Sequence, residues 1–104
     1  MSFRRYEIIL PTRYNDGAPV EPEKFLSTYE ELVSEFGALS YQPEVLRGIW
    51  THQSQRFEES NVRLVIDVKD TQQSSEFFRK YKQTLKERFR QIDLWIVSFE
   101  IRLT

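Results

Sequence analysis

Few side chains in this sequence could carry out chemistry. It contains a single histidine, His52, and no cysteine, which excludes disulfides, thiolate catalysis, iron–sulfur clusters and cysteine-based zinc sites. An imidazole can act as a general base near neutral pH, but the only candidate partners near His52 are Ser54 and, across a predicted turn, Arg56 or Glu58. We therefore expect a solvated histidine and assign no catalytic residue, so the sequence favours a protein that is not an enzyme.

The carboxylates add no metal site. Glu30–Glu31 and Glu58–Glu59 are neighbours in the sequence, so their side chains diverge on a helix or a strand. No second ligand stands three or four residues from His52 in the pattern that metal sites use. We predict neither a metal nor a cofactor.

A loop between two predicted elements holds the first group of candidate ligand-binding residues. Arg13, Tyr14 and Asp16 lie in the segment Arg13-Tyr14-Asn15-Asp16-Gly17, where an arginine and an aspartate could fix an anion or a polar ligand. The segment has one glycine and no Ser/Thr-Lys pair, so it is not a phosphate-binding loop. The sequence favours the alternative of a structural turn, in which Asn15 and Asp16 bond to the backbone.

A second group of candidates lies on the strand that ends at His52. Arg47 and Trp50 offer a charge and a broad aromatic face with one donor, and Gly48 between them indicates a bulge or the close approach of another backbone. The full set of candidate ligand-binding residues is Arg13, Tyr14, Asp16, Arg47, Trp50 and His52, for a small molecule whose class stays open.

Charge is balanced over the whole chain but segregated along it. The 15 basic residues against 16 acidic ones exclude a globally basic nucleic-acid binder. The charged residues in 22–36 are mainly glutamates, whereas those in 76–90 are mainly lysines and arginines. Nucleic-acid binding by the second segment is the weaker alternative, because strand 62–68 lacks the aromatic residues on which an RNA-recognition domain stacks bases. Its basic residues are Arg79, Lys80, Lys82, Lys86 and Arg90.

The length and the apolar content fit one domain over residues 1–104. A chain of 104 residues with 39% hydrophobic residues can bury a core of its own. No stretch approaches the ~20 apolar residues of a membrane helix, and the N-terminus has no apolar run of signal-peptide length. We expect a cytoplasmic protein with no membrane partner.

Six predicted elements alternate with turn-forming residues. They are a strand over 6–10, a helix over 22–36, strands over 45–52 and 62–68, a second helix, and a strand over 94–103. Pro22 and Gly37 mark the ends of the first helix, and Asp70 is predicted to cap the second with Gln73 at the capping-box position. The alternative for the third strand is a start at Arg56, which would make a long hairpin with the second strand. The order β-α-β-β-α-β is that of the α+β ferredoxin-like sandwich, a four-stranded antiparallel sheet of order 4-1-3-2 with two helices on one face. Another open-faced α+β sandwich is the alternative.

Alternation assigns side chains to the two faces of the sheet. Toward the helices we expect Tyr6, Ile8, Leu10, Val62, Leu64, Ile66, Val68, Trp95, Val97, Phe99, Ile101 and Leu103, packed on the helical residues Phe25, Tyr29, Leu32, Val33, Phe36, Phe78, Tyr81, Leu85, Phe89 and Ile92. The uncovered face is predicted to carry Glu7, Ile9, Arg63, Val65, Asp67, Leu94, Ile96, Ser98, Glu100 and Arg102, with either Gly48, Trp50 and His52 or Arg47, Ile49 and Thr51.

The uncovered face would have an apolar centre, formed by Ile9, Val65, Leu94, Ile96 and Trp50. Monomers seldom expose such a patch, and the long last strand would leave unpaired backbone groups at an edge. We therefore expect a non-catalytic interaction or regulatory domain that forms a homodimer through the open face or the last strand. The alternative is a small-ligand-binding protein or enzyme with a cleft between the open face and the 12–17 loop.

Several segments together resemble a group of small bacterial proteins, cyanobacterial members among them. The segments are Leu10-Pro11-Thr12-Arg13-Tyr14-Asn15-Asp16-Gly17, Pro22-Glu23-Lys24-Phe25, Arg47-Gly48-Ile49-Trp50, Leu85-Lys86-Glu87-Arg88-Phe89-Arg90-Gln91 and Trp95-Ile96. The resemblance covers nearly the whole chain and implies a cytosolic single domain of ferredoxin-like architecture. It carries over no catalytic residue.

Overall fold

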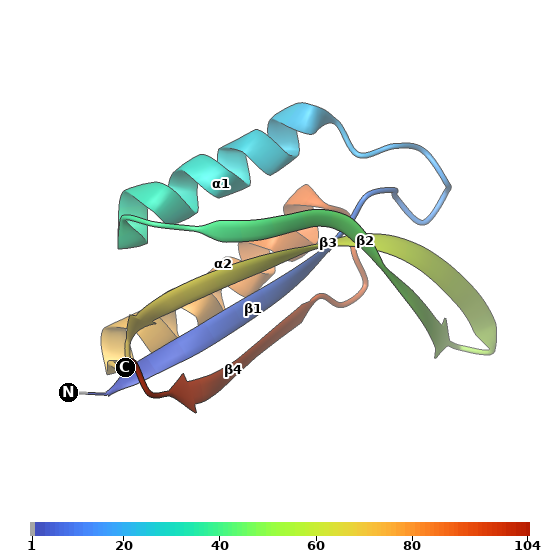
Figure 1. Ribbon diagram of the computed structural model, residues 1–104. Coiled ribbons are helices and arrows are strands. Elements are labelled where there is room, and N and C mark those ends of the chain that lie inside the picture. The colour runs from blue at the N-terminus through green and yellow to red at the C-terminus, as the bar shows by residue number, and fades with distance from the viewer. Residues whose placement is uncertain (1) are drawn as a thin grey trace.

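The computed structural model describes residues 2–104 and, for 44–48, 50 and 57–59, the course of the backbone alone. Its elements are β1 (Phe3–Pro11), α1 (Pro22–Phe36), β2 (Ser40–His52), β3 (Gln55–Lys69), α2 (Gln72–Arg88) and β4 (Trp95–Ile101). The strands form one antiparallel sheet of order β2-β3-β1-β4, with both helices on the same side (Figure 1). This confirms the predicted α+β ferredoxin-like fold and its strand order.

Helix α1 has the bounds that its flanking residues predict. Pro22 occupies the first turn, where a backbone N–H has no partner within the helix, so the N–H that proline lacks costs no hydrogen bond. Gly37 follows the last helical residue with a φ of 83°, and its N–H donates to the carbonyl of Val33 at 2.7 Å. Because glycine adopts this left-handed conformation with little strain, the helix ends there and the chain turns into β2.

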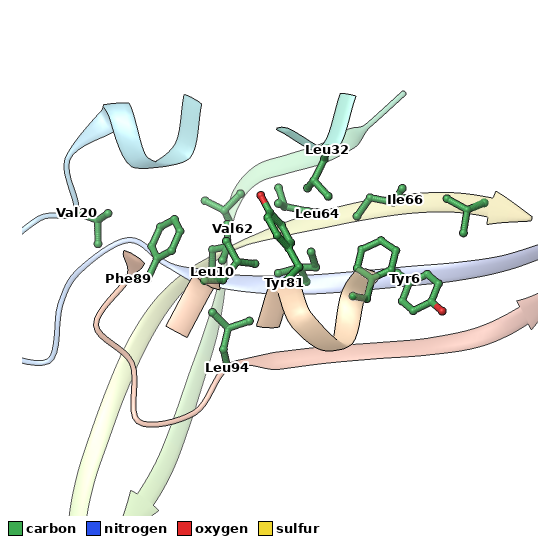
Figure 2. Packing of buried hydrophobic residues seen from close by; sticks show 14 of the residues in the cluster. Tyr6, Leu10, Val20, Leu32, Val62, Leu64, Ile66, Tyr81, Phe89 and Leu94 are labelled. Carbon is green, nitrogen blue, oxygen red and sulfur yellow. The ribbon is translucent and has the colours of Figure 1, made fainter. Parts of the chain in front are cut away.

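The core lies between the helices and one face of the sheet, as Figure 2 shows. Its largest fully buried side chains are Ile8, Leu10, Thr28, Leu32, Leu64, Ile66, Leu85 and Phe89. Tyr6 of β1 stacks on Phe78 of α2 with ring centroids 3.9 Å apart. The predicted inward faces of β1 and β3 are thereby confirmed.

The cap of α2 differs from the prediction. Thr71, not Asp70, is the capping residue, because its Oγ1 accepts a hydrogen bond from the N–H of Ser74 at 3.1 Å. Asp70 accepts one from Nε of Arg4 at 3.0 Å instead. A hydroxyl caps a helix nearly as well as a carboxylate, which leaves Asp70 to tie the end of β3 to β1.

Two helix-side residues that were predicted to point inward are half exposed. Val33 lies on the outer side of α1, with 46% of its surface exposed, and Ile92 has 43% exposed. The prediction for Ile92 fails because α2 ends at Arg88 and the chain then reverses through Arg90, which has a φ of 51°. The helical periodicity therefore stops before it reaches Ile92.

Strand β4 presents the opposite faces from those predicted. Leu94 is buried, whereas Trp95, expected in the core, has 65% of its surface exposed. The register pairs Trp95 with Ile9 and Ile96 with the buried Ile8, so odd-numbered residues face outward and even-numbered ones face the helices. Trp95, Val97, Phe99 and Ile101 thus lie on the open face, and Leu94, Ile96, Ser98 and Glu100 do not. The strand ends at Ile101, so Arg102 and Leu103 lie beyond it.

Strands β2 and β3 form a hairpin that extends past the end of β1 (Figure 1). Its two-residue turn is made by Gln53 and Ser54, both with positive φ, as in the turns that suit twisted hairpins. The last pair of β1 and β3 is Pro11 with Asn61, so the hairpin projects by residues 55–60, or about 20 Å. Strand β3 begins at Gln55 and not at the predicted Val62, close to the alternative start at Arg56, and β2 begins at Ser40, five residues before the predicted 45.

Candidate functional site

The open face of the sheet carries an uninterrupted row of apolar side chains along β4. We call this row the apolar column: Trp95, Val97, Phe99 and Ile101. Ile9 pairs with Trp95 at one end of the column, and Phe3 pairs with Ile101 at the other. Phe99 has 44% of its surface exposed. Because both helices lie on the other side of the sheet, the column faces outward.

The other part of the open face is charged, and its charges pair within the chain. Arg5 of β1 holds Asp67 of β3 by two hydrogen bonds, at 2.8 and 2.9 Å. Glu7 accepts hydrogen bonds from Nε and Nη2 of Arg63, at 3.1 and 2.5 Å. The hydrogen bond from Arg5 lowers the pKa of Asp67 below its usual value. Of these four residues, the sequence analysis placed Glu7, Arg63 and Asp67 on this face, and Arg5 joins them through its pairing with Asp67.

The loop that holds Arg13 and Asp16 is built as a turn. Nη1 of Arg13 donates to the carbonyl of Gly17 at 2.9 Å, and Oδ1 of Asp16 accepts from the N–H of Ala18 at 2.9 Å. Gly17 has a φ of 90°, which favours glycine. The backbone bonding that was predicted as the alternative is therefore present, and both side chains are exposed at the rim of the loop.

Tyr14 anchors this loop to the start of α1 and to the segment that follows α2. Its ring is 5% exposed and lies under the guanidinium of Arg90, whose Cζ is 3.7 Å from the ring centroid. Its hydroxyl donates to Glu21 and accepts from Nζ of Lys24 at 2.5 Å. The Tyr14 hydroxyl is the main cause that lowers the pKa of Glu21 to about 2. Tyr14 thus differs from Arg13 and Asp16 in being buried.

The remaining candidates belong to the projecting hairpin. His52 is exposed at its tip, next to the turn, while the side chains of Arg47 and Trp50 lie outside the described residues. The loop and the hairpin lie at the same end of the sheet (Figure 1), and both the N–H and Oγ1 of Thr12 donate to the carbonyl of Ser60, at 2.8 and 3.1 Å. The fold therefore brings the two groups of candidates to one end of the molecule.

An ionic network between the helices escaped the sequence analysis. The guanidinium of Arg88 in α2 donates to both carboxylate oxygens of Glu31 in α1, at 2.7 and 2.9 Å, and to Oγ1 of Thr28 at 2.8 Å. The Tyr81 hydroxyl donates to Glu31 at 2.7 Å. The hydrogen bonds from Arg88 lower the pKa of Glu31, and burial raises that of Tyr81. The acidic first helix and the basic second helix were the available signal, but they did not identify the pair.

Glu31→Gln is expected to destabilise the protein by about 0.5–1 kcal/mol at neutral pH, because Arg88 loses its charged acceptor. A carboxyl whose pKa is lowered by folding contributes stability above its unfolded pKa, and this is lost as the pH falls through the folded pKa. The difference from wild type in urea unfolding should therefore shrink toward zero in acid. Glu30→Gln is the control, and an equal loss there at neutral pH would contradict the prediction.

Two of the predicted basic residues form contacts within the chain. Nζ of Lys82 in α2 lies 3.2 Å from Asp93, and Arg90, just beyond α2, covers Tyr14. Nucleic-acid binding by this helix stays a prediction. Among the side chains that the structure describes, no group of three or more histidines, aspartates or glutamates is placed to hold a metal ion. None of the described helices is long and apolar enough to cross a membrane.

No protein-family model and no curated protein matches this sequence. Among solved structures, a phage SAM lyase in complex with S-methyl-5'-thioadenosine matches with a TM-score of 0.71 at 16% identity, over 98% of this chain and 90% of the lyase. The divalent cation tolerance protein Cut A1 from Thermus thermophilus matches with a TM-score of 0.65 at 19% identity, over 98% and 86%. The PII-like protein CutA from Nostoc sp. PCC 7120 matches with a TM-score of 0.61 at 17% identity, over 97% and 81%.

At these identities the likeness is one of fold. The resemblance to small bacterial proteins stays a prediction. The fold of this chain is the ferredoxin-like fold of the CutA proteins and the phage lyase.

Proposed function

We propose that this chain is a non-catalytic interaction or regulatory protein that works as a homo-oligomer, with the apolar column as its interface. The observation that carries the proposal is the exposure of Trp95 and Phe99 in one row with Val97 and Ile101. Fully burying one large apolar side chain is worth roughly 1.5–3 kcal/mol, and soluble monomers seldom leave such a row in water. A homodimer is the smallest assembly that could remove the apolar column from water.

Sedimentation velocity tests the proposal. At tens of micromolar, the wild-type chain should sediment well above its monomer mass of 12.6 kDa. Trp95→Arg places a charge in the column and should weaken association by at least about tenfold. Leu26→Arg is the matched control, because Leu26 is an exposed apolar residue on α1 and lies away from the column. A wild-type chain that sediments as a monomer would contradict the proposal.

A second candidate function is the binding of a small ligand between the loop that joins β1 to α1 and the base of the hairpin. The hydrogen bonds from Thr12 to Ser60 support it, because they hold the loop with Arg13 and Asp16 at the end of the sheet from which the hairpin with His52 projects. The similar phage lyase was solved with S-methyl-5'-thioadenosine, which makes this compound a suitable first probe.

Thermal unfolding measures ligand binding directly, because a ligand that binds only the folded state raises the midpoint. S-methyl-5'-thioadenosine at about 100 times its dissociation constant would stabilise the fold by about 2.7 kcal/mol. Arg13→Ala and Asp16→Ala should reduce the shift, whereas His52→Ala should leave it unchanged, because His52 lies at the far tip of the hairpin. No shift with the wild type at millimolar concentration, or an unchanged shift in both Arg13→Ala and Asp16→Ala, would count against this site.

A further inference from the structure

A groove of about 530 Å³ runs between α1 and α2 on the outer side of the helices. Its wall on α1 carries the carboxylates of Glu30, Glu31 and Glu35, and none of its described lining residues is basic. Its floor on α2 is aromatic, because the rings of Phe77 and Tyr81 stack there with centroids 5.1 Å apart. Both helices lie on the opposite side of the sheet from the apolar column, so the groove is separate from the proposed interface.

At one end of the groove, the acidic wall already holds a guanidinium group from within the chain. Arg88 of α2 donates to both carboxylate oxygens of Glu31, at 2.7 and 2.9 Å. The Tyr81 hydroxyl donates to the same carboxylate at 2.7 Å. Paired hydrogen bonds between a guanidinium and a carboxylate are among the strongest that side chains form. A carboxylate of α1 beside an aromatic ring of α2 is therefore an arrangement that binds arginine in this fold.

The next turn of each helix repeats this arrangement without the arginine. The helices run antiparallel, so four residues forward on α1 lie beside four residues back on α2. That step replaces Glu31 by Glu35, Tyr81 by Phe77 and Arg88 by Thr84. The carboxylate and the aromatic ring recur, but a neutral hydroxyl takes the position of the charged member. The chain itself therefore supplies no arginine to this second position.

We propose that this second position binds an arginine side chain of a partner protein, carried on a basic segment that lies along the groove. The charges support a cation there, because no ion pair among the described side chains includes Glu30 or Glu35. A guanidinium suits the position better than an ammonium, since its flat group stacks on a ring such as Phe77 while its N–H groups reach a carboxylate. The hydroxyls of Ser34 and Thr84 line the same groove and can accept further donors.

The shape of the groove favours a segment of a protein over a small molecule. The groove is open to solvent, and the three glutamates of its wall are exposed. Pockets for small ligands bury about 70–90% of the ligand surface, which an open groove does not achieve. A peptide segment makes additional contacts beyond the rim, and the aliphatic part of its arginine packs on the aromatic floor. The net charge of the whole chain is only −1, so attraction for a basic segment comes from the groove itself.

Fluorescence anisotropy with a labelled peptide tests the proposal. The probe Gly-Ser-Arg-Ser-Arg-Ser-Gly should bind to the wild-type chain. The same peptide with citrulline in place of both arginines keeps the shape of the side chains but has no charge on them, and it should bind at least about tenfold more weakly. Free L-arginine should also bind at least about tenfold more weakly than the probe, because it makes no contacts beyond the rim.

Two pairs of variants locate the binding site, and all four change exposed residues of α1. Ser34→Arg gives the groove a cation of its own and should weaken binding of the probe at least about tenfold. Ser27→Arg changes the net charge equally but lies outside the groove, so it should bind like the wild type. Glu35→Gln should weaken binding about two- to fivefold, whereas Glu23→Gln, outside the groove, should not.

Four results would overturn this inference. They are no binding of the probe to the wild type at millimolar concentration, equal affinity for the arginine and citrulline peptides, and equal affinity of Ser34→Arg and Ser27→Arg for the probe. The fourth is binding of free L-arginine as tight as that of the probe, which would make the groove a site for a small molecule. None of these results bears on the apolar column, whose test is the sedimentation of the chain.

Discussion

Replacing Phe89 by alanine is expected to lower the free energy of unfolding by about 3–5 kcal/mol. Phe89 is completely buried just past the end of α2 (Figure 2). Its ring and that of Phe25 pack edge to face, with centroids 5.2 Å apart. Alanine would keep the backbone bond from residue 89 to the carbonyl of Leu85 but would leave a cavity between the helices and the sheet. The loss would be a large part of the stability of a domain of this size.

Urea unfolding measures this effect, and Phe99→Ala is the matched control. The chemical change is the same, but Phe99 lies on the open face. Both substitutions should be made in the Trp95→Arg background, so that the loss of an interface is not counted as a loss of folding stability. We expect a change below about 1 kcal/mol for Phe99→Ala. Similar losses at the two positions would contradict the assignment of faces.

The contrast between β3 and β4 shows where sequence patterns determine a face. In β3, Leu64 and Ile66 alternate with Arg63 and Asp67, so only one phase buries apolar side chains. In β4, Trp95, Val97, Phe99 and Ile101 form a wholly apolar set, whereas the other set mixes Leu94 and Ile96 with Ser98 and Glu100, so periodicity favours burial of the set that in fact faces outward. The pairing with β1 makes the choice, because Ile96 must lie beside the buried Ile8. This constraint comes from the pairing of two strands and not from the local sequence. The prediction of which β4 residues face the helices was therefore wrong.

The same reasoning explains what was predictable about the candidate site. The charges of the open face alternate with buried residues of β1 and β3, and their positions followed from that alternation. The Asn15-Asp16-Gly17 signal likewise predicted the turn. The partners of Glu31 and Tyr14 come from segments that are distant in the sequence, Arg88 and Arg90, and local patterns do not report such contacts.

Truncation of Tyr14 is the second substitution with a large expected effect. Tyr14→Ala should lower the free energy of unfolding by about 2–4 kcal/mol, because it removes a buried ring together with two hydrogen bonds. The ring is the surface on which the guanidinium of Arg90 rests, and Arg90 holds a left-handed conformation there. The loop between β1 and α1 should then lose its attachment to the segment that follows α2, which would appear as faster amide exchange in the loop.

Tyr14→Phe separates the hydroxyl from the ring. It should cost only about 1 kcal/mol, because the ring stays under Arg90 and Lys24 keeps its ion pair with Glu21 at 3.3 Å. The pKa of Glu21, held at about 2 chiefly by the Tyr14 hydroxyl, should rise toward the ordinary value of a glutamate. The lowered pKa of Glu21 stabilises the folded protein, and this stabilisation is lost as the pH falls toward 2. The stability of the phenylalanine variant should therefore depend less on pH in acid. Carboxyl titration by NMR measures the pKa of Glu21, and an unchanged value would show that the Tyr14 hydroxyl does not set it.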